Sequence, residues 1–358
     1  MPAPLRPVLS QLKAYQPEEP KGDAALDANE NPYAPPKGWL ARAAAIAAAT
    51  DYQRYPDPTA AGLRRRLAVL HGLPGDGLLF GNGSDELIGL LLAAYGGGDA
   101  LCLLPRPTFS MYKLCALGQG WRVHEEDLGP DWGLTPAFVD AAHTLKPRLI
   151  FLASPNNPTG QAFDLGLVDA LRGLDGCTLV MDEAYAEFGG RSLLKDSGHE
   201  PGLVVLRTFS KAWGLAGLRL GWLSAEPALV QELEKLRMPY NLGRLTQALA
   251  CEALDMAPAF LGRVPHLLAM RKRLENALTR VPGLKLWPSD SNFVLARHPR
   301  AGALHDHLLS KGLRVRRFEG GRLGDCIRIN AGNEAQTVRL EAALADFGVS
   351  SNQGAPAL

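Results

Sequence analysis

The fold of this chain is indicated most clearly by the segment Arg207-Thr208-Phe209-Ser210-Lys211-Ala212-Trp213-Gly214-Leu215-Ala216-Gly217-Leu218-Arg219-Leu220-Gly221-Trp222. It follows Leu203–Leu206, an apolar run that predicts a buried strand. A lysine just beyond such a strand can lie in a low-dielectric pocket, where an amine becomes a nucleophile more readily. Ser210 and Arg219 offer a hydroxyl and a fixed positive charge, which suit a phosphate, and the glycines let the backbone approach a bound group. A strand, a loop and a surface lysine remain the alternative interpretation.

Length and composition indicate a soluble globular protein. A chain of 358 residues suggests two domains with ample core, and 46% hydrophobic and 21% charged residues are ordinary values. The formal charge of +1 gives no general electrostatic reason to bind nucleic acid or an anionic membrane, so any anion site must be local. The five cysteines form no CxxC pair, which argues against a disulfide framework or a zinc site and for a reducing cytoplasm.

No segment reads as a membrane anchor or a leader peptide. Met1–Ser10 lacks the apolar core of a signal peptide. The alanine-rich run Leu40–Ala49 contains Arg42 and is too short to span a bilayer, so it predicts a helix. We therefore expect a cytoplasmic protein with neither nucleic acid nor membrane as a partner.

The N-terminal residues 1–37 are rich in proline and predict an arm and loop that wrap another part of the molecule or another subunit. Tyr15 and Asn29-Glu30-Asn31 are its polar side chains. Turn chemistry is a strong competing explanation for the asparagines.

Apolar runs alternate with helical patterns through the centre of the chain. The predicted strands are 78–80, 101–104, 148–153, 178–181 and 203–206. Continuous apolar strands separated by helices indicate a mainly parallel sheet covered on both faces, and such sheets bind ligands at the carboxyl ends of the strands. A polar cluster follows each strand, so one crevice is expected to collect Asn157, Asp182, Tyr185, Ser210, Lys211 and Arg219.

The first of these clusters, Gly81-Asn82-Gly83-Ser84-Asp85-Glu86, leads into a helix whose apolar positions begin at Leu87. Free backbone N–H groups and the positive end of the helix dipole make such a start an anion site. An ordinary N-cap by Ser84 or Asp85 is compatible with the same pattern.

The C-terminal part predicts a second, smaller unit. Residues 227–280 are helical in pattern, and residues 283–347 alternate strands at 293–296, 313–316 and 326–329 with helices at 304–311 and 334–347. Gly348 is the expected stop of the last helix. The predicted organisation is an arm at 1–37, a large domain at 38–265, a small domain at 266–349 and a disordered tail at 350–358.

The polar residues suit a flat, phosphorylated aldehyde cofactor. Lys211 could form an imine with it, and Asp182 could keep a pyridine nitrogen protonated, which makes the ring an electron sink. Asn157 and Tyr185 could hydrogen-bond a ring oxygen, and Phe109 could stack on the ring. No metal cluster emerges, because His305 and His307 alone have ligand spacing and are expected on an exposed helix.

Several ordered motifs resemble one family. Ser154–Gly160, Asp182–Tyr185 and Ser210–Gly221 are similar to the fold-type I, pyridoxal-phosphate-dependent aminotransferases. The resemblance is closer to the histidinol-phosphate aminotransferase branch, which has counterparts of Leu26–Pro32, Arg54–Pro56, Gly81–Glu86 and Ile327–Ile329. It covers nearly the whole chain from Tyr15 to Phe347, and so many coincident motifs are not expected by chance.

This resemblance implies a large α/β domain with a mainly parallel sheet, a smaller α/β domain, and roles for individual residues. The catalytic residues would be Lys211, Asp182 and Tyr185, with Lys211 attached to the cofactor and shuttling the substrate proton. The cofactor would be held by Gly83, Ser84, Asp85, Phe109, Asn157, Asp182, Tyr185, Ser210, Lys211 and Arg219. Tyr55 would reach its phosphate from the neighbouring subunit of an obligate homodimer. Trp213 and Trp222 would serve packing.

The substrate would contact Tyr15, Asn157, Arg316 and Arg328. For Arg316 a solvated charge is the alternative, because Arg314 shares its strand face. The implied reaction is ping-pong transamination between L-histidinol phosphate and 2-oxoglutarate, giving imidazole acetol phosphate and glutamate in histidine biosynthesis. The alternatives are an aromatic amino acid aminotransferase, a decarboxylase of a phosphorylated amino acid, and a non-catalytic binding or regulatory protein on the same fold.

Overall fold

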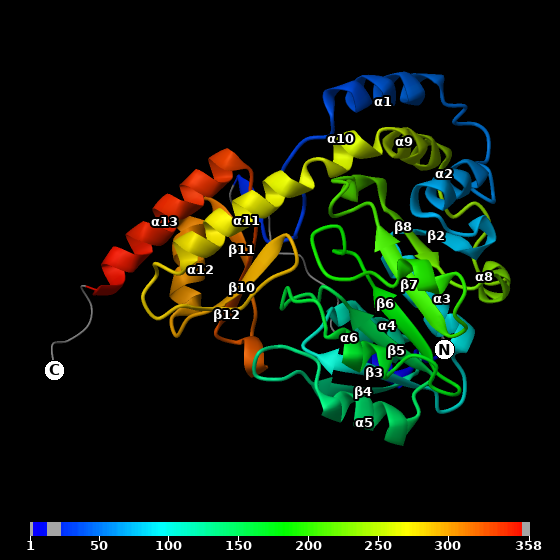
Figure 1. Ribbon diagram of the computed structural model, residues 1–358, viewed down its shortest axis with the longest axis horizontal. Coiled ribbons are helices and arrows are strands. Elements are labelled where there is room, and N and C mark those ends of the chain that lie inside the picture. Colours follow the sequence, from blue (N-terminus) through cyan, green and yellow to red (C-terminus); the bar gives the residue numbers. More distant parts are fainter. Residues whose placement is uncertain (1–2, 13–22, 353–358) are drawn as a thin grey trace.

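The computed structural model describes residues 3–12 and 23–352 of the chain (Figure 1). Tyr15, one of the predicted substrate residues, lies outside the described residues. Two sheets organise the described part, one of seven strands and one of five. This is the large α/β unit with a smaller α/β companion that the sequence predicts. The domain boundaries at 37/38, 265/266 and 349/350 stay predictions.

The large sheet is mainly parallel, as expected. Its order is β2-β8-β7-β6-β5-β3-β4, and only β8 runs antiparallel to its neighbours β7 and β2. The strands are β2 Leu78–Asn82, β3 Leu101–Arg106, β4 Arg122–Asp127, β5 Leu149–Ala153, β6 Thr178–Asp182, β7 Leu203–Thr208 and β8 Leu220–Ser224. The strands β5 to β8 are buried along their whole length, which explains their continuous apolar runs.

Two strands of this sheet were not predicted. The edge strand β4 reads Arg-Val-His-Glu-Glu-Asp and is half-exposed, so it lacks the apolar run that reveals a central strand. The strand β8 begins inside the segment Arg207–Trp222, where the sequence predicts a loop around a phosphate, and continues to Ser224.

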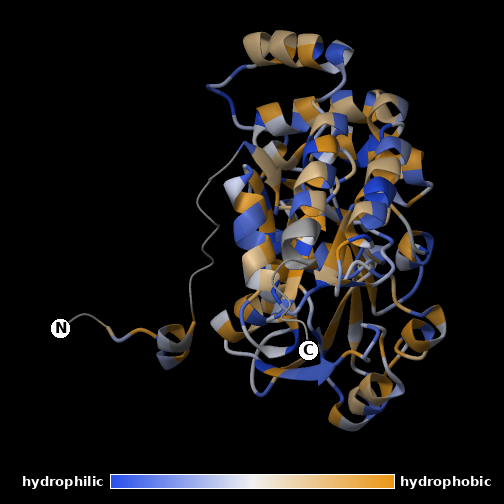
Figure 2. Ribbon diagram, turned by 90° about the vertical axis from the view of Figure 1, so that its left-hand side faces the viewer, coloured by the Kyte–Doolittle hydropathy of each residue, from blue (hydrophilic) through white to orange (hydrophobic). Residues whose placement is uncertain are grey.

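Helices cover both faces of the large sheet, and Figure 2 shows its mostly apolar strands enclosed by helices of mixed character. One face packs against α3 Ser84–Tyr95, α4 Ser110–Gly118 and α8 Pro227–Glu234. The other packs against α1 Lys37–Ala49, α2 Ala61–His71, α5 Pro136–Leu145, α6 Leu165–Asp169, α9 Arg244–Asp255 and α10 Ala257–Leu261. The short α7 Leu194–Ser197 precedes β7. Successive residues of one strand serve opposite faces: Phe151 joins the first core and Leu152 the second.

The small sheet has the order β1-β11-β12-β10-β9, with β1 Ala24–Leu26, β9 Lys285–Leu286, β10 Phe293–Arg297, β11 Leu313–Arg317 and β12 Cys326–Asn330. One face packs on α11 Val264–Leu278, α12 Ala301–Ser310 and α13 Glu334–Asn352. The strand β1 corrects the prediction for the N-terminal arm. Residues 24–26 are not loop but pair in parallel with β11, because their alternating burial matches the core of this sheet. The arm also contains the short 3₁₀ helix Pro7–Gln11.

The last helix is longer than predicted. Gly348 does not end α13, which continues to Asn352, so residues 350–352 are helical rather than part of a disordered tail. A glycine costs a helix only about 1 kcal/mol, which the packing of the long helix can override. Residues 353–358 of the predicted tail lie outside the described part of the chain.

Candidate active site

The polar clusters predicted from the strand ends come together at one edge of the large sheet. Asp182 ends β6 and pairs with Ala153, the last residue of β5, and with Leu206 of β7. The residues after β2, β3, β5 and β7 leave the sheet at this same edge, because these strands are all parallel to β6. The register therefore places Ser84, Phe109, Asn157 and Lys211 around Asp182.

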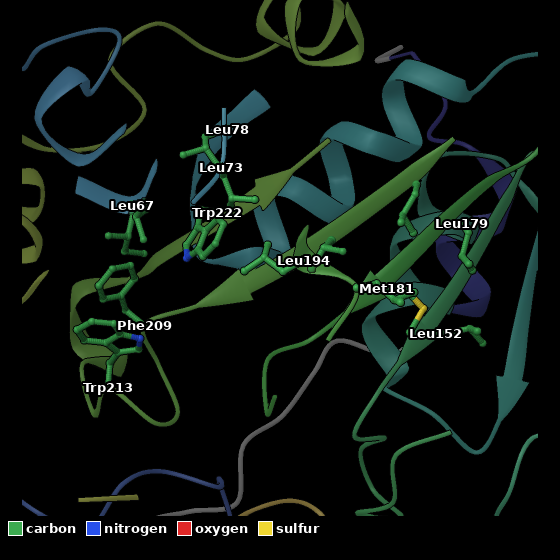
Figure 3. Close-up of a cluster of buried hydrophobic side chains, with 14 of the residues drawn as sticks. Leu67, Leu73, Leu78, Leu152, Leu179, Met181, Leu194, Phe209, Trp213 and Trp222 are labelled. Atoms are coloured by element: carbon green, nitrogen blue, oxygen red, sulfur yellow. The ribbon is translucent and has the colours of Figure 1, made fainter. Parts of the chain in front are cut away.

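The lysine loop is held by the hydrophobic core on both sides of Lys211. Phe209, Ala212 and Trp213 are each at most 3% exposed. The rings of Phe209 and Trp213 lie 4.9 Å apart and point into the core beneath Leu67 (Figure 3). This burial leaves Lys211 as the residue that projects from the loop. Its Nζ donates a hydrogen bond to the carbonyl oxygen of Ala28 at 2.9 Å and lies 5.8 Å from the Tyr185 ring centroid.

The packing role expected for the two tryptophans agrees with their burial. Trp213 and Trp222 are both 3% exposed. Both belong to the core on the α2 side of the large sheet, and neither takes part in the polar cluster.

Asp182 is a buried carboxylate held by two hydrogen bonds. The Tyr112 hydroxyl donates to Oδ2 at 2.6 Å and the Ala184 N–H donates to Oδ1 at 3.0 Å. Burial raises the pKa of Asp182 to about 6, although both hydrogen bonds oppose the rise. Burial and the neighbouring carboxylate in turn raise the pKa of Tyr112, so its hydroxyl remains a donor. A cation beside Asp182 would relieve the cost of burying its charge.

A tight backbone crossing, called the cradle below, lies at the helix start where the sequence predicts an anion site. The helix α3 begins at Ser84 with Gly83 as its N-cap and no side-chain cap, so the alternative interpretation, a cap by Ser84 or Asp85, is wrong. A Cβ on Gly221 would lie 2.3 Å from the Ser84 nitrogen, and one on Gly83 would lie 2.5 Å from Nη2 of Arg219. Glycine is therefore required at both positions for the helix start and the arginine to meet.

The cation of this cradle is Arg219. Its backbone has φ of 50°, and its Nη2 lies 3.3 Å from Oδ2 of Asp85 at the start of α3. Ser210, which follows β7, accepts a hydrogen bond from the Thr208 hydroxyl at 3.0 Å. The helix dipole, free backbone donors, a hydroxyl and a guanidinium together suit a phosphate.

The small sheet turns an arginine-bearing face toward these groups. Arg328 donates to Oδ1 of Asn157 at 2.5 Å and to the carbonyl oxygen of Asp27. Its guanidinium carbon lies 5.3 Å from the Phe293 ring centroid. Arg316 stands directly opposite Arg328 in the antiparallel pair of β11 and β12.

The same face also carries Arg314, as strand alternation predicts. Its Nε lies 2.8 Å from Oδ2 of Asp27, and both side chains are at most 15% exposed. Asp27 thus pairs with Arg314. Arg316 and Arg328 lie opposite each other on this face, and two guanidinium groups so placed suit an anionic substrate group.

One predicted residue lies elsewhere on the chain. The Tyr55 side chain is on the outer surface, 75% exposed and stacked on Tyr240 with ring centroids 4.6 Å apart. It does not join the site within this chain.

Two residues of the candidate site, Tyr112 and Asn29, were not predicted to belong to it. Tyr112 lies three residues after Phe109 on the same side of α4, and this spacing was the available signal. Asn29 has φ of 55°, as turn chemistry predicts, but its amide also bonds the Tyr185 hydroxyl at 2.9 Å.

Other kinds of site find little support within residues 3–12 and 23–352. No cluster of three or more histidine, cysteine, aspartate or glutamate side chains there is arranged to hold a metal ion. No helix in that part is both long and apolar enough to cross a membrane.

The two-sheet architecture, with a lysine, a buried aspartate and an anion cradle at the strand ends, defines a fold-type I pyridoxal-phosphate-dependent transferase, as the sequence predicts. The sequence model of the family described as "Aminotransferase class I and II" matches residues 23–344. The chain belongs to this family and is an aminotransferase.

Individual relatives are similar over almost their full length. "Histidinol-phosphate aminotransferase 2" of Nitrosococcus oceani is 37% identical over 92% of this chain and 92% of the relative. "Histidinol-phosphate aminotransferase 1" of Carboxydothermus hydrogenoformans is 38% identical over 92% and 95%. The crystal structure of histidinol-phosphate aminotransferase from Sinorhizobium meliloti in complex with pyridoxal-5'-phosphate has a TM-score of 0.88 and 26% identity, covering 97% of this chain and 98% of that one.

Proposed function

We propose that this aminotransferase uses pyridoxal 5'-phosphate to transfer the amino group of L-histidinol phosphate to 2-oxoglutarate, in histidine biosynthesis. The main support is that Arg316 and Arg328 lie opposite each other on the small sheet. Arg328 also contacts Asn157, one of the residues proposed to hold the cofactor. Histidinol phosphate has a phosphate and no carboxylate, and a phosphate is well matched by two guanidinium forks. The relatives named for this substrate support the same assignment.

The residues present fit the cofactor. Asp182 is a buried anion whose raised pKa makes a neighbouring pyridinium favourable, and the glycine-dependent crossing at Ser84 and Arg219 fits a phosphate. Phe109 would stack on the ring, while Asn157 and Tyr185 would bond its oxygen. When bound, the cofactor supplies an electron sink for a carbanion at the substrate carbon.

The residues of the chain itself have separate roles in the proposed reaction. Lys211 carries the proton between the substrate carbon and the cofactor, and the buried residues beside it keep its Nζ on the crevice side. Asp182 would keep a ring nitrogen beside it protonated, and Tyr112 holds the Asp182 carboxylate in place. Arg328 and Arg316 orient the anionic end of each substrate, with Tyr15 as a further phosphate contact.

Arginine substitutions test the substrate assignment. For Arg316→Ala we expect kcat/KM with histidinol phosphate to fall by roughly 10²-fold, because charge-assisted hydrogen bonds to the phosphate are lost. With phenylalanine the loss should be under about threefold, since Arg328 would still hold the carboxylate. Arg317→Ala is the matched control, because Arg317 is exposed and lies against Gly302 of α12. Similar losses on both substrates would exclude a phosphate role for Arg316 and favour the aromatic aminotransferase.

We further propose an obligate homodimer in which Tyr55 reaches the cofactor phosphate of the neighbouring subunit. The 75% exposure of the Tyr55 side chain supports this arrangement. The exposed apolar side chains Tyr52, Leu236, Met238 and Tyr240 would be covered by the partner. We place the enzyme in the cytoplasm, consistent with five free cysteines, and cell fractionation tests this placement.

Mixing two inactive variants tests the shared site. Tyr55→Ala and Lys211→Ala subunits, unfolded together and refolded, should recover about a quarter of wild-type activity, because half the dimers are mixed and each mixed dimer has one intact site. Activity is measured by glutamate formation. If Tyr55 serves its own chain, the mixture stays as inactive as its components.

A further inference from the structure

Asn29 is fixed by two buried asparagines of the small domain. Its backbone N–H donates to Oδ1 of Asn330 at 3.2 Å, and Nδ2 of Asn292 donates to its carbonyl oxygen at 3.1 Å. Asn29, Asn292 and Asn330 are at most 1% exposed. Both main-chain polar groups of Asn29 are thus satisfied in a left-handed conformation, with φ of 55°, that asparagine tolerates better than most residues.

The Asn29 side chain crosses to the large domain. Its Nδ2 lies 2.9 Å from the hydroxyl oxygen of Tyr185, which is 5% exposed and packs edge-to-face on Phe293 at 5.3 Å. The side-chain amide nitrogen of asparagine can only donate hydrogen bonds, so the Tyr185 oxygen is the acceptor of this bond. The hydroxyl hydrogen of Tyr185 is left to point at a different acceptor.

The opposite amide orientation is less favourable. As found, Oδ1 of Asn29 is buried and has no hydrogen-bond partner among the residues that the structure describes. If the side-chain amide were rotated by 180°, Oδ1 would accept a hydrogen bond from the Tyr185 hydroxyl. The NH2 group would then occupy the present position of Oδ1, where the structure offers it no acceptor among the described residues. Buried unpaired donors are rarer in proteins than buried unpaired carbonyl oxygens.

We propose that Asn29 is a positioning residue that directs the Tyr185 hydroxyl proton at the ring oxygen of the cofactor. This inference rests on the proposed function, in which Tyr185 donates to that oxygen. By occupying one lone pair of the phenol, Asn29 turns the remaining O–H toward the crevice and strengthens its donation. The bond also links the position of the small domain, through Asn292 and Asn330, to the contact made by Tyr185.

Binding of pyridoxamine 5'-phosphate to the full-length apoprotein tests this role without turnover, because this probe makes no covalent bond to Lys211. Tryptophan fluorescence gives its dissociation constant, and circular dichroism verifies that each variant is folded. Asn29→Asp keeps the shape but can only accept, so it should capture the Tyr185 proton and weaken binding about tenfold to a hundredfold. Asn29→Gly retains the left-handed backbone and should weaken binding less, which preserves the test if the aspartate variant does not fold.

The same substitutions in a Tyr185→Phe background separate positioning from other effects. There both Asn29 changes should alter the dissociation constant by less than about threefold, because no hydroxyl remains to be directed. Equal losses with and without the hydroxyl would overturn the proposal, since charge or packing would then be the cause. Wild-type affinity in Asn29→Asp, with weakened binding in Tyr185→Phe, would overturn this inference alone. Wild-type affinity in Tyr185→Phe would instead overturn the Tyr185 contact in the proposed function.

Discussion

Replacing Lys211 with alanine is expected to lower the rate of transamination by at least about 10³-fold, because the proposed proton carrier and attachment point of the cofactor is lost. The variant should also lose the covalent link to the cofactor. Borohydride treatment followed by mass spectrometry measures this link directly, since the wild-type chain should gain the mass of the reduced cofactor and the variant should not.

The fold should survive this change. Within the described part of the chain the Lys211 side chain donates one hydrogen bond, to the carbonyl oxygen of Ala28, and the loop around it is held by Phe209 and Trp213. Lys235→Ala is the matched control, because Lys235 is an exposed lysine paired with Glu232 at 2.5 Å, away from the crevice. A Lys211→Ala protein that transaminates at the wild-type rate would show that another residue carries the proton.

Asp182→Asn is expected to move activity and apoprotein stability in opposite directions. The rate should fall by roughly 10²-fold or more, because the ring nitrogen loses the anion that keeps it protonated. The apoprotein should become more stable at pH 7, because burying the Asp182 charge costs about 3 kcal/mol when its pKa is raised from 3.8 to about 6. Urea unfolding of the two apoproteins measures the difference.

The stability difference between the wild-type and Asp182→Asn apoproteins should depend on pH. Folded apoprotein takes up a proton at Asp182 as the pH falls through about 6, whereas the unfolded chain does so only near 3.8. The buried charge therefore lowers the free energy of unfolding of the wild type by the full amount above pH 6, and this loss disappears as the pH falls toward 3.8. The stability advantage of Asp182→Asn should shrink over that range. An advantage that stays constant between pH 7 and pH 4 would contradict the raised pKa.

The strands of the large sheet show what can be predicted from local pattern. β5, β6 and β7 are buried on both faces, so their sequences are uninterrupted apolar runs. β4 is a half-exposed edge strand with four charged or titratable side chains in succession, and β1 has three residues, so neither has a recognisable pattern. Pairing with β11 makes Ala24–Leu26 a strand, and pairing is a property of the folded chain.

The gathering of the residues predicted to hold the cofactor could be foreseen for a related reason. Asn157, Asp182 and Lys211 each follow an apolar strand, and parallel strands bring their carboxyl ends to one edge whatever the details of packing. The arrangement of the arginines on the small sheet was less predictable from the sequence. That Arg316 stands opposite Arg328, while Arg314 is neutralised by Asp27, depends on strand register and on a segment nearly three hundred residues away in sequence.

The sequence by itself determined the family of this protein, its large parallel sheet, and the placement of Lys211, Asp182 and the glycine crossing at Ser84 near the strand ends, because these are encoded in short motifs and in strand order. Only the tertiary structure decided that Tyr112 holds Asp182 and that Asn29 reaches Tyr185. These contacts join residues 70 and 156 positions apart. No local pattern specifies such a pair, since its geometry follows from how helices and two domains pack.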